Sequence, residues 1–84
     1  MQMSFELIVP TIIETQLTGK FGGIRKEHRG RIFEVIFWNH GNTVCTKNGG
    51  SVAWEKMPHV IRKAAHEGFE VLKQGHEMRR AASQ

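Results

Sequence analysis

The sequence predicts a small α+β protein in which an antiparallel sheet of three to four strands packs against one C-terminal amphipathic helix. Apolar residues follow strand-like patterns up to residue 47 and recur with helical spacing from residue 58 onward. The chain has 84 residues and one cysteine, so we expect one domain without an internal disulfide. That domain, residues 1–84, divides into an N-terminal strand segment (1–17), a basic β-hairpin sheet (20–47), a helix (58–75) and a tail (76–84).

The N-terminal segment has the pattern of an edge strand. Residues 2–9 come close to the alternation of a half-buried strand. Pro10 lacks a backbone donor, so it places this strand at a sheet edge or ends it. The β-branched run Thr11–Thr15 favours resumption of the strand, after a bulge.

Arg31–Trp38 is the strongest strand in the sequence, because it is apolar on both faces. We expect one face to pack on the helix and the other to meet the N-terminal segment or a second subunit. A homodimer is a natural way to complete so small a core. The residues predicted to lie in the core or a dimer interface are Phe33, Val35, Phe37 and Trp38.

The remaining elements are predicted from turn-forming residues and from a change in the spacing of the apolar residues. Residues 39–42 predict a turn, and Thr43–Thr46 predicts the returning partner strand. Residues 51–57 fit a short strand or irregular structure better than a helix, because Pro58 biases Met57 toward extended geometry. Pro58 opens the helix and Gly75 can end it, and the residues from His76 onward fit a frayed helix end or a basic tail. The apolar stripe of that helix consists of Ile61, Ala65, Gly68 and Leu72.

Positive charge is concentrated in one short segment. The chain carries 12 Lys and Arg against 8 acidic residues, a net charge of +4. The segment Lys20–Arg31 holds five of these cations against Glu27 alone, so it accounts for the whole excess. Such clustering is typical of proteins that bind polyanions, although a solvated basic loop has the same composition. The residues predicted to contact nucleic acid are Lys20, Arg25, Lys26, His28, Arg29 and Arg31.

Catalytic and metal-site patterns are weak in this sequence. The chain contains no Asp, and Cys45 lies in a strand pattern where a packing role outweighs pairing with His40. His59 and His66 are seven residues apart on a helix, too far to share one ion. We therefore predict no enzyme activity, no cofactor and no metal. A membrane span and a secretory signal are not expected either, which favours a cytoplasmic protein.

One stretch resembles a known DNA-binding fold. Residues 23–26, then Gly30–Phe37, a turn, a third strand and an amphipathic helix are similar to the three-stranded-sheet-plus-helix domain of plant ethylene-response factors and integrase amino-terminal domains. The likeness covers roughly residues 22–72. It implies that the sheet enters the major groove, with Arg25, Lys26 and Arg31 on the side that faces DNA. Dimeric single-strand-binding transcriptional coactivators are the rival resemblance, in which Phe21 or Trp38 could stack on bases.

The sequence thus predicts a small DNA-binding protein with a transcriptional or accessory regulatory role and duplex DNA as its partner. Two alternatives use other features of the chain. One is an RNA or single-strand binder with the same cations plus exposed aromatic rings. The other is a protein-interaction module or small inhibitor, which uses the doubly apolar strand Arg31–Trp38 or the helix.

Overall fold

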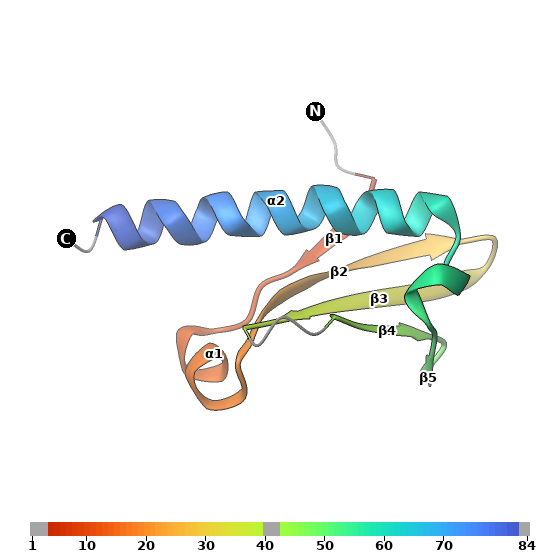
Figure 1. Cartoon of the computed structure of the whole chain (residues 1–84), viewed down its shortest axis with the longest axis horizontal. Coiled ribbons are helices and arrows are strands. Elements are labelled where there is room, and N and C mark those ends of the chain that lie inside the picture. Colours follow the sequence, from red (N-terminus) through yellow and green to blue (C-terminus); the bar gives the residue numbers. More distant parts are fainter. Residues whose placement is uncertain (1–3, 40–42, 83–84) are drawn as a thin grey trace.

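The computed structural model describes residues 4–39 and 43–82, and the side chains of 4–39 and 43–75. It has two layers, a five-stranded antiparallel sheet and one long helix (Figure 1). The strands lie in chain order, so each pairs with its sequence neighbour. The α+β class with a C-terminal helix is confirmed, although the sheet has five strands rather than three or four.

The described residues form five strands, two α-helices and one 3₁₀ turn. The strands are β1 (Glu6–Ile8), β2 (Lys20–His28), β3 (Arg31–Trp38), β4 (Thr43–Lys47) and β5 (Gly50–Ser51). The helices are α1 (Ile12–Thr18), the 3₁₀ turn η1 (Trp54–Lys56) and α2 (His59–Ala82). The predicted bounds of β3 are confirmed. Three residues of the predicted turn that follows it, 40–42, lie outside the described residues.

The prediction that residues 11–17 continue the strand is wrong, because most of them form α1. Thr11 caps this helix: its Oγ1 accepts a hydrogen bond from the backbone N–H of Glu14 at 3.1 Å. Gly19 ends it in the left-handed conformation, with φ at 80°. A threonine cap with glutamate three residues later is a capping-box pattern, and here it outweighs β-branched composition.

The core lies between α2 and the face of the sheet that α2 covers. Phe33, Val35 and Phe37 point into this core and are buried, as are Ile24 of β2 and Ile61 of α2. These three residues of β3 are therefore core residues. Trp38 lies on the opposite face and is half-buried.

The helix is longer than predicted. It was expected to end at Gly75, yet α2 continues to Ala82, so most of the predicted tail is helical. Gly75 costs an α-helix only about 1 kcal/mol relative to alanine, and no proline follows it. The residues after Gly75 include good helix formers, among them Glu77 and Arg80, which carry the helix past it.

Candidate nucleic-acid interface

The tight turn between β2 and β3 presents two free arginines. His28 pairs with Arg31, so only Arg29 and Gly30 form the turn. Both have positive φ, 53° and 76°, as a type I′ turn requires. Arg29 and Arg31 are exposed and form no ion pair within the described part of the chain. Their guanidinium groups are therefore available to an anion.

These arginines lie beside the start of α2. His28, Arg29 and Arg31 line a pocket of about 440 Å³, together with Phe33 and Pro58. Phe33 belongs to the core, so Arg31, on the same face of β3, reaches past it toward the helix. The first turn of α2 contains no acidic residue. An anion in this pocket would meet cationic groups from the turn and the positive end of the helix dipole.

Arg25 lies on the other face of the sheet and is already paired. It stands opposite Glu34 in the register of β2 and β3. Its Nε and Nη2 donate to Oε2 of Glu34, at 3.0 and 2.7 Å. The hydrogen bond to Glu34, followed by the charge of that carboxylate, raises the pKa of Arg25. A nucleic acid would have to compete with Glu34 for this side chain.

The other two cations of the segment are also set apart. Lys26 points to the face that α2 covers, and its Nζ donates to the carbonyl of Ser4 at 2.6 Å. Lys20 lies at the far end of β2, roughly 27 Å from His28 at the usual rise of a strand. The resemblance implied that Arg25, Lys26 and Arg31 share one face. The register corrects this, because alternate residues of a strand point to opposite faces.

The fold gathers other cations around the arginines of the turn. In a sheet whose strands follow chain order, every second turn lies at the same end. The end of β4 and the start of α2 therefore join the β2–β3 turn, and η1 lies there too (Figure 1). We call this region the basic end. Its Lys and Arg residues are Arg29, Arg31, Lys47, Lys56, Arg62 and Lys63.

The basic end carries the net charge of the protein. Its six cations face two acids, Glu27 and Glu55, while the other six cations and six acids of the chain cancel. Lys47, Lys56, Arg62 and Lys63 were not predicted, because the sequence window around Lys20–Arg31 does not include them. The alternation of turns along the chain is the signal that could have found Lys47.

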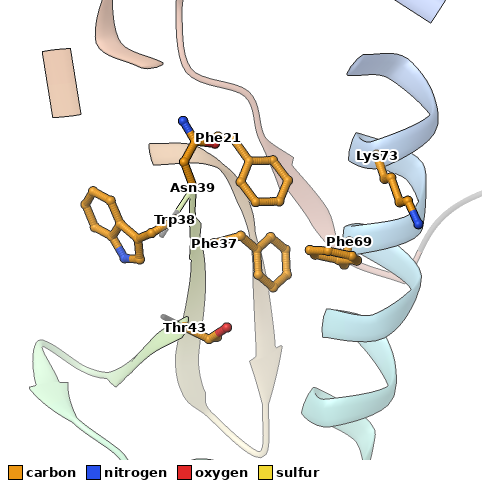
Figure 2. Close-up of a pocket in the computed structure, with 7 residues that line it drawn as sticks. All are labelled: Phe21, Phe37, Trp38, Asn39, Thr43, Phe69 and Lys73. Atoms are coloured by element: carbon orange, nitrogen blue, oxygen red, sulfur yellow. The ribbon is translucent and has the colours of Figure 1, made fainter. Parts of the chain in front are cut away.

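A second pocket lies near the opposite end of the sheet, between β2, β3 and α2. The rings of Phe21, Phe37 and Phe69 pack together there, with centroids 5.3 to 6.0 Å apart. Figure 2 shows these rings between the sheet and the helix, with Trp38 pointing away from them. The pocket, of about 400 Å³, is also lined by Trp38, Asn39, Thr43 and Lys73. Phe21 is held by two neighbouring rings, which makes it a poor platform for stacking on a base.

The described residues offer little for chemistry. Cys45 is buried in β4, and burial raises the pKa of its thiol, which disfavours the reactive thiolate. Its proposed partner His40 lies outside the described residues. Within the described chain, no three His, Cys, Asp or Glu side chains are placed to hold a metal ion. None of the helices there combines the length and the apolar character needed to cross a bilayer.

Comparison with protein-family models, curated proteins and solved structures found no significant match to this chain. The resemblance to ethylene-response factors and integrase amino-terminal domains therefore stays a prediction.

Proposed function

We propose that this protein binds duplex DNA through its basic end, in a transcriptional or accessory regulatory role. The observation that carries the proposal is the location of the net positive charge. Six cations from the β2–β3 turn, β4, η1 and the start of α2 lie at one end of a chain whose other charges balance. A polyanion would gain most by approaching this end.

The contact is with the phosphate backbone rather than with base edges. Arg29 and Arg31 are exposed at the turn and form no ion pair with another described residue, so both can donate to phosphate oxygens. The sheet face that bears Arg25 also bears Glu6, Glu27 and Glu34, which repel phosphates. This disfavours insertion of the flat sheet into the major groove and makes the turn the leading edge. Sequence preference would come from one arginine, or from none.

The test is a salt titration of binding to a labelled DNA duplex, followed by fluorescence anisotropy. With about four phosphates neutralised, log K should fall with log salt at a slope near −3.6. Replacing Arg29 and Arg31 together with alanine should bring that slope to about −1.8, since each lost contact removes about 0.9. Circular dichroism should show that the double variant keeps its fold.

A matched control variant distinguishes the effect of where the charges lie from the effect of the total charge of the protein. Replacing Lys20 and Lys73 with alanine removes the same two charges outside the basic end. This variant should keep a slope near that of the native protein. Equal losses in both variants would show that only total charge matters and would overturn the assignment to the basic end. In the same assay, tighter binding of single-stranded DNA or RNA would replace the duplex as the partner.

A further inference from the structure

Helix α1 exposes more apolar surface than a short helix can sustain alone. None of its residues is buried. Ile12 and Ile13 are both more than half exposed, and Leu17 is 80% exposed. A seven-residue helix is far below the length that is stable in water, and helices gain most of their stability by packing an apolar face. None of the described residues buries this apolar face.

Within residues 4–39 and 43–82, no helix packs on the sheet face opposite α2. One row across four strands consists of Ile8, Gly23, Ile36 and Val44, which are paired in register. Val44 is 41% exposed, and Ile32, near the end of the same face, is 50% exposed. No described helix covers this row, since α2 packs on the other face.

Helix α1 adjoins the end of the sheet. Lys20 pairs with Trp38 in the next row of the sheet, and the N–H of Asn39 donates to the carbonyl of Gly19, the cap of α1, at 2.7 Å. Helix α1 therefore extends directly from the end of the sheet, and Figure 1 draws it on the side away from α2. We call α1 together with this sheet face the open face.

The charges of the open face favour a second copy of this chain as its partner. On the open face, Arg25 and Lys20 stand beside four acids, one of which is Glu14 of α1, and Arg25 is neutralised by Glu34. A face with an excess of two acids offers nothing to a polyanion or to an anionic lipid surface. Acids and bases side by side do suit a second copy of the same face, because a two-fold rotation brings each sign near the other. The acids of the sheet face are Glu6, Glu27 and Glu34.

The sheet face alone covers about half of the area that a stable interface needs. Strands β1 to β4 contain 25 residues, which at a rise of about 3.4 Å and a spacing of about 4.8 Å give a flat footprint of roughly 400 Å². Side-chain relief and α1 enlarge the accessible area toward the roughly 800 Å² per partner found in stable complexes. We propose that two copies of this chain associate through their open faces. The proposal does not depend on DNA binding, because the basic end lies outside this surface.

The experiment is sedimentation equilibrium of the full chain across the micromolar range. The native protein should sediment with about twice its mass of 9.6 kDa. Leu17→Glu and Val44→Glu should each raise the dimer dissociation constant tenfold or more, because each buries an unpaired carboxylate in the interface. Both side chains are exposed in the isolated chain, so the monomer should keep its circular dichroism spectrum and its melting temperature.

Val71→Glu is the matched control, since Val71 is 42% exposed but lies on α2. This variant should dimerise like the native protein. A native protein that remains monomeric throughout would overturn the proposal. So would a dimer that Leu17→Glu and Val44→Glu leave unchanged, or one that Val71→Glu weakens as much as they do. DNA binding by a monomer would leave the function of the basic end intact and remove only the dimer.

Discussion

Gly68 of α2 lies directly against the side chain of Ile24 in β2. A Cβ atom at Gly68 would collide with Cγ2 of Ile24, which is fully buried. At this contact the helix backbone approaches the sheet closely. This approach explains why a residue that weakens helices stands within the apolar stripe of α2.

Gly68→Ala should destabilise the protein by about 1–2 kcal/mol, since overpacking a core costs more than the gain in helix propensity. Gly75→Ala is the matched variant, because the space around Gly75 is open. It should stabilise the protein by about 0.5–1 kcal/mol. Urea unfolding of both variants checks the pair. A Gly68→Ala variant as stable as Gly75→Ala would show that the helix can move away from Ile24 at little cost.

Arg29→Asn should separate stability from binding. Arg29 occupies the left-handed region at φ 53°, which asparagine tolerates better than arginine does. The substitution should stabilise the protein by up to about 1 kcal/mol while it weakens DNA binding. Arg29→Lys keeps both the charge and the strained conformation, so it should change each property less. Thermal melting and anisotropy measured on the same samples provide the check, and unchanged DNA affinity in Arg29→Asn would argue against a contact at the turn.

Arg25 of β2 and Arg31 of β3 should contribute differently to DNA binding, although both lie in the segment Lys20–Arg31. Arg31→Ala should reduce the magnitude of the salt slope by about 0.9. Arg25→Ala should change it less, because Glu34 already neutralises Arg25. The slopes are measured with the same duplex, and equal effects would mean that Glu34 releases Arg25 to DNA.

The thiol of Cys45 should make stability fall in alkaline solution. Burial raises its pKa in the folded state, so folding favours the protonated thiol. This contribution is complete below the unfolded thiol pKa of about 8.5 and is lost as the pH rises from there through the raised folded value. Urea unfolding from neutral to alkaline pH should show a steeper decline for the native protein than for Cys45→Ala. Parallel profiles would mean that the thiol ionises equally well in both states.

The sequence patterns that depend on burial were the ones most reliably interpreted. The doubly apolar run Arg31–Trp38 predicted β3, and the stripe containing Ile61 and Ala65 predicted the face of α2 that packs on the sheet. Both patterns come from the hydrophobic effect, which acts on every residue of an element at once. By contrast, α1 is bounded by local caps at Thr11 and Gly19, which the β-branched composition of the segment hides.

The candidate site was predicted only in part, for a different reason. Charge counted along the chain singles out the β2–β3 hairpin, but it ignores the face to which each side chain points. Arg25 and Lys26 are adjacent in sequence and lie on opposite faces of β2. Lys47 and Arg62 lie far from the turn in sequence, and the return of the chain brings them to the same end.

The strand order has a consequence for how the protein is made. Because each strand pairs with its predecessor, the sheet can assemble hairpin by hairpin as the chain leaves the ribosome, with little loop-closure entropy to overcome. The layer that shields Ile24 and Val35 from water is synthesised after the sheet. Until α2 is complete, both faces of the nascent sheet are exposed to solvent. During that interval the chain is most prone to aggregate.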